Sequence, residues 1–395
     1  MPDRAYVQSH PWIKFRVDLD HASSQFWMLL GEARSKCDHI KFVPLREDTA
    51  RALNLVYFAK GVNATTAIEG NTLSEEQVRE RLEGQLELPM SKEYLGVEID
   101  NMIGAYNDIV HAVERGEHIP VSIETLCNLN RQILAGLDLE ENVIAGELRQ
   151  YDVRAGTYLA APWGDVPYLL NELCSWLDGP AFQPPDDSQR IPYAFIKAAA
   201  AHIYLEWIHP FGDGNGRLGR LVEFLILIGH GVPMPAAHVL TSHYNDTRTE
   251  YYRQLNQASR NGGDLRGFLQ YAAQGFVDGL TAAIKHLHKQ QEQLMWQALV
   301  DDLHDLHTPA AHRQRLLAIE LARADGWIPR SEARRLSPPL IEAYAGKTSK
   351  TLSRDVNRLA DLGLVRRRNT RLRANLALVR GMRPLVVGHE GEANE

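Results

Sequence analysis

Two helical segments separated by a glycine-rich, charged stretch constrain the fold of this chain more than any other feature. Apolar side chains recur three and four positions apart over residues 191–208, and the same spacing resumes over residues 218–225. This spacing predicts two amphipathic helices that pack in the core. The stretch that links them, HPFGDGNGRLGR over residues 209–220, holds one histidine, four glycines, one aspartate and two arginines. We therefore predict a loop and a helix start here, with Phe211 as the apolar anchor into the core.

The composition of this loop suits a bound polyanion. Its glycines leave several backbone N–H groups unobstructed, and the positive end of the dipole of the following helix lies behind them. Arg217 lies in the first turn of that helix, and Arg220, three residues further on, shares its face. Together these features predict a site for a di- or triphosphate.

Asp213 and His209 add chemistry to this anion site. A carboxylate beside phosphates is unfavourable unless a divalent cation lies between them, and Mg²⁺ takes one or two carboxylates together with phosphate oxygens, with Mn²⁺ as the alternative ion. His209, at the entrance of the loop, is the natural general base near neutral pH. The stretch lacks the GK[ST] of a Walker A loop, and no strand precedes it as in a Rossmann fingerprint. Any one of these residues alone would fit an ordinary turn or a solvated helix charge.

The same twelve residues resemble the HPFx(D/E)GNGRxxR signature of Fic-domain proteins and match it at every defined position. The resemblance covers much of residues 50–275 and implies a mainly helical fold that transfers AMP from Mg-ATP to a Ser, Thr or Tyr hydroxyl of a protein target, including the chain itself. It implies that His209 deprotonates the hydroxyl, that Asp213 holds Mg²⁺ and that Arg220 binds the γ-phosphate of ATP. The implied nucleotide-binding residues of the motif are Asp213, Gly214, Asn215, Gly216, Arg217 and Arg220.

The motif also bears on the group that is transferred. A branch of the family that transfers phosphate has a lysine at the position of Gly216, so the glycine favours transfer of AMP. A phosphate site does not discriminate between bases, and a different donor, such as one that supplies UMP or phosphocholine, stays open. The other alternative is a DNA-binding regulator whose Fic core only senses nucleotide, although the intact His209 favours an enzyme.

A second informative segment is TTAIEGNT, residues 65–72. Thr65 and Glu69 are four residues apart and share a helix face, which alone would indicate only a surface glutamate at a helix end. The segment resembles the (S/T)xxxE(G/N) inhibitory motif of Fic proteins, with Thr65, Glu69 and Gly70 at the defined positions. The resemblance implies that Glu69 pairs with Arg220 and disfavours the productive binding of ATP. In some relatives this glutamate also helps to remove AMP from the target, and the sequence leaves that activity open.

Two further segments resemble parts of Fic proteins that surround the nucleotide. Residues 148–162 predict a short β-hairpin with its turn at Arg-Ala-Gly, and they resemble the family's flap, which holds the target by strand addition; a plain edge hairpin is the alternative. Residues 250–264, EYYRQLNQASRNGGD, resemble the part that lines the adenine and ribose, although they are slightly longer before GGD, and the two tyrosines also fit core aromatics. The implied nucleotide-binding residues are Val153, Arg154, Ala155 and Gly156 in the flap, and Tyr251, Tyr252 and Asn261 in the second segment.

The charge distribution divides the chain. The whole chain has a net charge of −7, yet Arg330–Arg383 holds 14 basic and 4 acidic residues. At 395 residues the chain is long enough for two or three compact units. We predict an N-terminal helical region with the inhibitory helix at about residues 50–70, a Fic core with its hairpin flap, a connecting helix and linker, a winged-helix-like domain, and a tail. Their predicted bounds are 1–95, 96–280, 281–308, 309–384 and 385–395.

The basic C-terminal part has the pattern of a winged helix. Residues 326–336 and 348–365 each predict a helix, and residues 365–379 predict the hairpin wing. The second helix has a buried stripe of Leu352, Val356, Leu359 and Leu362, and its outward basic residues are Lys350, Arg354 and Arg358. Helix-turn-helix geometry with an excess of arginine fits DNA contact. A protein-interaction module and a merely solvated arginine-rich face are the alternatives.

Cysteine spacing and hydropathy indicate the compartment. Cys37, Cys127 and Cys174 are far apart and form no CxxC pair, which favours a reducing cytoplasm and argues against a zinc site. No run of about 18 apolar residues predicts a membrane span, and the first residues, MPDR, lack the apolar core of a signal peptide. We therefore expect a cytoplasmic protein whose partners are ATP and a protein target. Homodimers are common among Fic proteins, but no residue here indicates one.

Overall fold

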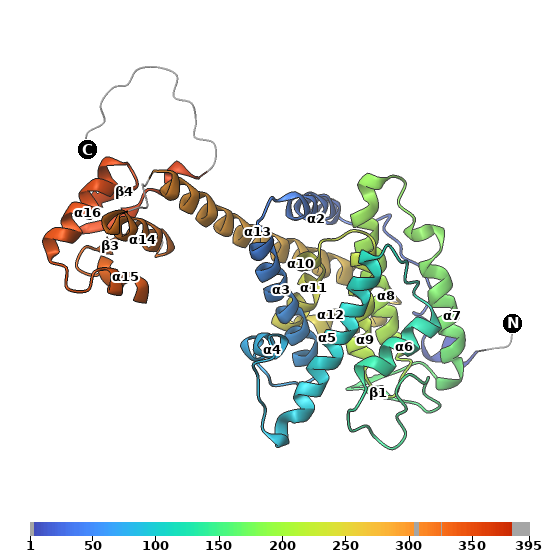
Figure 1. Cartoon of the computed structure of the whole chain (residues 1–395). Coiled ribbons are helices and arrows are strands. Elements are labelled where there is room, and N and C mark those ends of the chain that lie inside the picture. The colour runs from blue at the N-terminus through green and yellow to red at the C-terminus, as the bar shows by residue number, and fades with distance from the viewer. Residues whose placement is uncertain (1–3, 304–307, 325, 381–395) are drawn as a thin grey trace. The chain divides into compact units, whose positions relative to one another are not determined.

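The computed structural model describes residues 4–303, 308–324 and 326–380, and it confirms the predicted mainly helical fold class (Figure 1). The chain divides into two compact units, of which the first ends at Ile284 and the second begins at Lys285. The predicted N-terminal region and the predicted Fic core both belong to the first unit. Much of the predicted connecting segment is helix, and the predicted tail lies outside the described residues.

The first unit consists of helices and one short hairpin. Its α-helices, in chain order, are α1 (Ala5–Ser9), α2 (Ser24–Phe42), α3 (Glu47–Ile68), α4 (Glu75–Leu82), α5 (Glu93–Glu114), α6 (Ile123–Ile133), α7 (Val166–Leu177), α8 (Arg190–Ile208), α9 (Asn215–Gly229), α10 (Met234–Ala237), α11 (Val239–Asp246), α12 (Arg248–Arg260) and α13 (Arg266–Asp302), which continues into the second unit. The hairpin consists of β1 (Arg154–Ala155) and β2 (Tyr158–Leu159). None of the helices within the described ranges combines the length and the apolar character that a membrane span requires.

The helices α8 and α9 form the centre of the first unit (Figure 1). Nearly every residue of α9 is buried, and a helix that is buried on all sides must lie in the core. Helices α2 and α7 pack on α8, whereas α3, α5 and α6 pack on α9. The loop between α8 and α9, which contains the charged motif, is therefore anchored in the core at both of its ends.

The C-terminal end of α3 is held by several contacts. The helix ends at Ile68, and Gly70 has a φ of 105°, a left-handed conformation that glycine adopts without steric cost. Arg248 of α12 donates a hydrogen bond to the Ile68 carbonyl, one of the carbonyls that a helix end leaves without a helical partner. Helix α4 then begins with a capping box, in which Ser74 and Gln77 exchange side-chain and backbone hydrogen bonds. These contacts fix the segment that contains the predicted inhibitory motif.

The predicted hairpin is confirmed, but its predicted turn is shifted. Arg154 pairs with Leu159 and Ala155 pairs with Tyr158, in antiparallel register. Because the first two residues of Arg-Ala-Gly are paired in β1, the turn consists of residues 156–157 instead. A two-residue hairpin turn requires positive φ, which the glycine at 156 supplies with a φ of 59°.

The second unit is a small domain of helices around a three-stranded sheet. Its elements after α13 are α14 (Pro309–Arg323), β3 (Ile328–Pro329), α15 (Pro338–Ala343), α16 (Ser349–Asp361), β4 (Val365–Arg368) and β5 (Arg371–Ala374). The strands pair antiparallel in the order β3-β5-β4. Buried side chains from the helices and the sheet form one apolar core. The fold is winged-helix-like as predicted, with α16 as the second helix of the helix-turn-helix and the β4–β5 hairpin as the wing.

One predicted helix of the second unit is wrong. Residues 326–336 form the strand β3 and a single 3₁₀ turn, Ala333–Arg335, rather than a helix. Strand β3 pairs with β5, which lies about forty residues further along the chain. This pairing outweighs the local helical propensity, because a short segment of mixed propensity takes the conformation that its tertiary partners stabilise. The first helix of the helix-turn-helix is therefore α15.

The core of the second unit predicts the effect of truncating Leu359. This side chain on α16 is 0% exposed, whereas Leu378 of the same unit is 44% exposed. Leu359→Ala should destabilise the unit by about 2–5 kcal/mol, because it leaves a cavity, and Leu378→Ala should change its stability by less than about 0.5 kcal/mol. Hydrogen exchange of the α16 amides, measured by mass spectrometry, checks both values. Equal protection of these amides in the two variants would contradict the described core.

Candidate active site

His209 ends helix α8 in an uncommon backbone conformation. Its φ of 50° is left-handed, which costs a residue with a Cβ about 1–3 kcal/mol. The backbone N–H still donates to the Leu205 carbonyl at 2.8 Å, so the chain leaves the helix at this residue. Nδ1 of the imidazole is buried without a hydrogen-bond partner among the described residues, and Oε2 of Glu206 lies 3.9 Å from it.

The surroundings of His209 keep its imidazole neutral. Burial lowers the pKa of His209, because the charged imidazolium would lose its hydration. The carboxylate of Glu206 opposes this effect, whereas the guanidinium of Arg149 adds to it, and the pKa lies below its ordinary value of 6.5. The imidazole is therefore neutral near pH 7 and can accept a proton.

Two side-chain amides fix the loop that precedes α9. Asn215 accepts a hydrogen bond from the Phe211 N–H at 2.9 Å and donates one to the Phe211 carbonyl at 2.8 Å. Asn130 of α6 donates to the Asp213 carbonyl at 2.9 Å and accepts from the Gly146 N–H at 2.9 Å. Three of these bonds fix the backbone of the loop without using its charged side chains, and the bond from Gly146 fixes the amide of Asn130.

Arg149 joins the loop to the segment before the flap hairpin. Its guanidinium is completely buried. Nε donates to the His209 carbonyl at 2.7 Å and Nη1 to the Tyr151 carbonyl at 2.7 Å. Nη2 donates to the carbonyls of Ala161, at 2.5 Å, and Ile208, at 3.2 Å. A guanidinium has five N–H donors, and here four carbonyl oxygens accept from them, while the Asp152 carboxylate lies 3.8 Å from Nη1.

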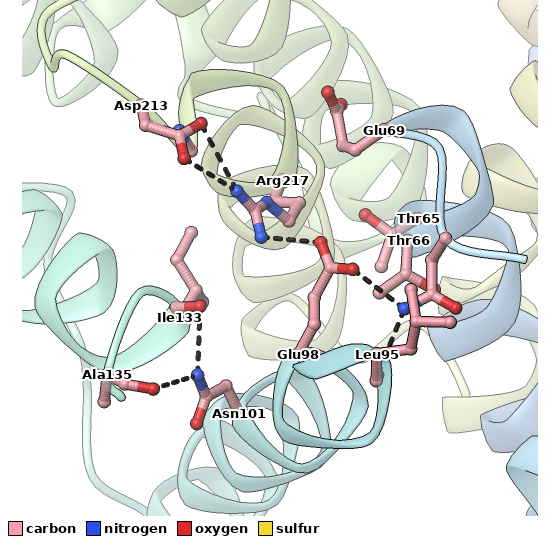
Figure 2. Close-up of polar contacts among 12 residues, drawn as sticks. Thr65, Thr66, Glu69, Leu95, Glu98, Asn101, Ile133, Ala135, Asp213 and Arg217 are labelled. Atoms are coloured by element: carbon pink, nitrogen blue, oxygen red, sulfur yellow. Dashed lines mark hydrogen bonds and ion pairs between the residues drawn. The ribbon is translucent and has the colours of Figure 1, made fainter. Parts of the chain in front are cut away.

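Arg217 lies between two carboxylates, as Figure 2 shows. Its Nη1 donates to Glu98 Oε1 on α5 at 2.6 Å, and its Nη2 lies 3.3 and 3.4 Å from the two carboxylate oxygens of Asp213. The second oxygen of Glu98 accepts a hydrogen bond from Asn71 Nδ2 at 2.8 Å, and this amide also donates to the Leu95 carbonyl at 3.1 Å. A continuous series of polar contacts therefore links the segment after α3 to the carboxylate of the loop.

Arg220 contacts a different group of residues. Its guanidinium is buried, its Nε donates to Thr65 Oγ1 at 2.9 Å, and its Nη2 donates to the Thr65 carbonyl at 3.0 Å. The same Nη2 forms an ion pair with Glu69 Oε1 at 2.5 Å. The side chain of Glu69 stays 34% exposed. Although Arg217 and Arg220 are only three residues apart, they bind separate sets of partners.

The carboxylate of Glu69 lies against the N-terminal turn of α9. A Cβ at Gly216 would collide with Oε1 of Glu69, so the glycine is what makes room for this carboxylate. Burial alone would raise the pKa of Glu69, but the charge of Arg220, with that of Arg217, outweighs burial and lowers the pKa below its usual range. Glu69 is therefore ionised at neutral pH. Its carboxylate lies at a helix N-terminus and pairs with an arginine, and both features favour a bound anion.

The predicted flap residues are on the hairpin. Val153 precedes β1, and Arg154, Ala155 and Gly156 are exposed. Tyr158 donates from its hydroxyl to a carbonyl at the end of α8, at 3.0 Å, which ties the hairpin to the helix that leads into the loop. Strand β1 pairs only with β2 within the described part of the chain, so its other edge is unpaired.

The three residues predicted for the adenine and ribose lie in different environments. Tyr251 is buried, its hydroxyl is 2.9 Å from His202 Nε2, and its ring stacks on Tyr244 with 4.7 Å between centroids. These are the contacts of a core aromatic. Tyr252 is exposed. Asn261 lines a hollow of about 220 Å³ whose other walls include basic residues near the N-terminus and the turn that follows α12.

Sequence reasoning missed four residues that hold the site together: Asn71, Glu98, Asn130 and Arg149. Asn71 follows the inhibitory glycine directly and Arg149 belongs to the flap pattern, so both lie within segments that the motifs had marked. Glu98 and Asn130 come from α5 and α6, 119 and 83 residues before their partners in the loop. No local pattern indicates them, because their role depends on how these helices pack.

The site thus combines a neutral imidazole, a half-exposed carboxylate, two buried arginines and a glycine-rich helix start. Such a combination is suited to an anionic, phosphate-bearing ligand beside a group that can accept a proton. Residues 120–227 match the model of the family described as Fic/DOC, so this part of the chain is a Fic/DOC domain.

Curated relatives are similar to this chain over part of their length. The protein adenylyltransferase fic-1 of Caenorhabditis briggsae is 34% identical over 235 residues, which are 59% of this chain and 43% of the relative. The protein adenylyltransferase Fic of Aedes aegypti is 30% identical over 215 residues, 53% of this chain and 38% of the relative. The chain therefore spans less than half the length of these relatives.

Solved structures share the fold. Fic-1 of Caenorhabditis elegans, residues 134–508 of that protein, is 28% identical with a TM-score of 0.55, over 67% of this chain and 73% of that chain. A Fic family protein from Desulfovibrio desulfuricans G20 is 21% identical, with a TM-score of 0.55 over 91% of this chain and 98% of that chain. At 21% identity, the similarity to the Desulfovibrio desulfuricans protein is evidence for the fold alone.

The buried guanidinium of Arg149 makes Arg149→Lys a test of the loop anchor. A lysine keeps the charge but has a single donor group, which cannot reach carbonyls on both sides, and each unsatisfied buried group costs about 1–3 kcal/mol. We expect the first unit to lose about 2–4 kcal/mol of stability, measured by urea denaturation. Arg154→Lys, on the exposed flap, is the control and should leave the stability unchanged. If Arg149→Lys is as stable as its control, Arg149 does not anchor the loop.

Proposed function

We propose that this chain is a protein adenylyltransferase that transfers AMP from Mg-ATP to a Ser, Thr or Tyr hydroxyl of a protein target, and that Glu69 inhibits it. The observation that carries the proposal is the ion pair between Glu69 and the buried Arg220, in the same site as the neutral His209. A carboxylate that pairs with an arginine at a helix N-terminus lies where a phosphate group would bind. The relatives described as protein adenylyltransferases support AMP as the group transferred.

The proposed reaction is a displacement at the α-phosphorus of ATP. The target hydroxyl oxygen forms a bond to this phosphorus, the bond to the oxygen that bridges to the β-phosphate breaks, and pyrophosphate leaves. The neutral imidazole of His209 accepts the hydroxyl proton as the new bond forms. Arg217, Arg220 and the backbone N–H groups at the start of α9 stabilise the negative charge on the phosphates.

Asp213 is the residue that would hold Mg²⁺ beside the phosphates. Its carboxylate is 50% exposed, and it bonds to the N–H of Gly214 and to Arg217. The described ranges contain no group of three or more His, Cys, Asp or Glu side chains that could hold a metal ion by themselves. The protein would thus supply one carboxylate, and ATP phosphates and water the other ligands, a set that Mg²⁺ accepts and that Mn²⁺ also suits. The ion would neutralise charge on the phosphates.

Glu69 inhibits the proposed reaction by competing for Arg220. The guanidinium cannot bind the carboxylate and the γ-phosphate in the same geometry, and a charge-assisted arginine–carboxylate pair is strong in a partly dry site. ATP must therefore displace Glu69 before its γ-phosphate reaches Arg220. Since the side chain of Glu69 is partly exposed at one side, it can leave without unfolding α3.

Replacement of Glu69 tests the proposed inhibition and the proposed base together. Wild type, Glu69→Gly and Glu69→Gly with His209→Ala are incubated with Mg²⁺ and ATP labelled at the α-phosphate, with cell lysate as a source of targets. We expect at least about tenfold more protein-bound label in Glu69→Gly than in wild type, because the variant lacks the carboxylate that competes with ATP for Arg220. A tenfold change corresponds to a competing interaction of about 1.4 kcal/mol. The double variant should bind no label, because it lacks the base.

Glu83→Gly is the matched control for Glu69→Gly. Glu83 is the C-cap residue of α4, as Glu69 is of α3, but its side chain is exposed and, among the described residues, forms no hydrogen bond or ion pair with the loop. It should label like wild type. Label in the double variant would exclude His209 as the base, and label only with a donor other than ATP would replace AMP as the transferred group. If only wild type releases AMP from a labelled target, Glu69 also serves in AMP removal.

The lowered pKa of His209 predicts the pH dependence of the uninhibited enzyme. A base whose pKa lies below 6.5 is mostly unprotonated, and therefore active, at every pH above 6.5. Single-turnover AMP transfer by Glu69→Gly at saturating Mg-ATP should thus reach its half-maximal rate only below pH 6.5. A half-maximal rate at or above pH 6.5 would show that burial does not keep this imidazole neutral.

A further inference from the structure

Helix α16 and the β4–β5 hairpin of the second unit carry a concentration of exposed basic side chains. The exposed basic residues are Lys347, just before α16, and Lys350, Arg354, Arg358, Arg366, Arg367, Arg368 and Arg371. Within the described residues, none of these eight forms an ion pair with a carboxylate. Other arginines of the unit do so, such as Arg313 with Asp355 at 3.2 Å and Arg315 with Asp301 at 2.5 Å.

The basic residues of α16 form one stripe along the helix. Lys350, Arg354 and Arg358 are spaced by four residues and share a face, opposite the buried Leu352, Val356 and Leu359. Like charges four residues apart destabilise a helix by a few tenths of a kcal/mol per pair, about 0.2–0.5 kcal/mol. The only exposed carboxylate of this helix is at its last residue. The stripe therefore has a cost that no internal partner offsets.

The wing repeats this arrangement on a strand pair. Arg366 lies directly opposite Arg373, and Arg368 lies directly opposite Arg371. Opposed residues of an antiparallel pair share a face, and so do residues two apart on one strand, so these four arginines lie on a single face of the hairpin. Like charges in direct opposition destabilise a strand pair. On the other face, Arg367 donates to Asn357 of α16 at 2.8 Å, which fixes the wing to the helix.

The chemistry of this surface indicates phosphate groups rather than a protein groove. No large apolar side chain of α16, β4 or β5 is among the exposed ones in the described ranges. Protein interfaces are enriched in exposed aromatic and apolar residues at their centre, and this surface has none. The basic stripe is also extended, since Lys350 and Arg358 are eight residues apart, which is about 12 Å along a helix.

We propose that the second unit binds duplex DNA, with α16 in the major groove and the arginines of the β4–β5 hairpin on the phosphate backbone. The major groove of DNA, about 12 Å wide, admits an α-helix, whereas that of duplex RNA is too narrow for side chains to read. In a helix-turn-helix the second helix enters the major groove, and in the pair α15 and α16 this helix is α16. DNA binding is independent of AMP transfer, and either can fail without the other.

The proposal is tested with the full chain and a fluorescein-labelled 25-base-pair duplex of mixed sequence, by anisotropy between 50 and 200 mM salt. We expect a Kd near 1–100 µM at physiological salt that weakens steeply as salt rises. The stripe variant, Lys350→Gln with Arg354→Gln and Arg358→Gln, should weaken binding at least about tenfold and reduce the salt slope by about 3.

The control variant removes three exposed arginines of the first unit, Arg46→Gln, Arg51→Gln and Arg115→Gln, and so has the same net charge as the stripe variant. It should bind DNA like wild type. Thermal unfolding excludes misfolding as the cause, because removal of like-charge repulsion should leave the second unit as stable as wild type or more so. If the stripe variant is less stable than wild type, these basic residues stabilise the fold instead of binding DNA.

Competition identifies the class of partner. Unlabelled duplex DNA should displace the probe at lower concentration than duplex RNA or poly-glutamate of equal charge. Equal binding by the stripe and control variants would overturn the proposal, and so would absence of binding by wild type at 50 mM salt. Stronger competition by duplex RNA or by poly-glutamate would replace DNA with an RNA or an acidic protein segment as the partner.

Discussion

The burial of the Arg220 guanidinium is the constraint on which the rest of the active site depends. Arginine keeps its charge in any protein environment, so a guanidinium that is 1% exposed needs acceptors and an anion. To leave such a charge unpaired costs about 3–5 kcal/mol. The C-terminal end of α3 supplies both needs through Thr65 and Glu69. A ligand that displaces Glu69 must therefore bring negative charge of its own, as the proposed nucleotide phosphate would.

Arg217 connects this position to the other charged group of the loop. It contacts Asp213 directly, and through Glu98 it reaches Asn71, which follows the inhibitory segment in the chain. The C-terminal end of α3 and the residue Asn71 after it are therefore linked to the motif in two ways, through Arg220 and, by way of Glu98, through Arg217. Movement of Glu69 away from Arg220 would act on a segment that also orients Arg217 and, through it, Asp213. Asp213, proposed to hold the metal, and Glu69, proposed to inhibit, are parts of one polar cluster.

The fold could be predicted where its pattern is local. The core helices α8 and α9, the helix α3, and α16 with its wing follow from apolar spacing and turn residues, and all are present. The helix predicted over residues 326–336 is wrong, because that segment pairs with a strand much further along the chain. The turn of the flap hairpin moved by two residues for a similar reason: strand register depends on the partner strand, and a short segment does not encode its partner.

By itself, the sequence determined the chemistry of the site. His209, Asp213, Arg217 and Arg220 lie within twelve residues, and a glycine-rich loop between two core helices keeps them together whatever surrounds them. Only the tertiary structure decided which distant carboxylate each arginine receives, Glu98 for Arg217, which also contacts the neighbouring Asp213, and a glutamate 151 residues away for Arg220. The reason is physical: a buried guanidinium takes the partner that packing brings within reach, and the packing of α3 and α5 on α9 depends on the whole core rather than on any local pattern.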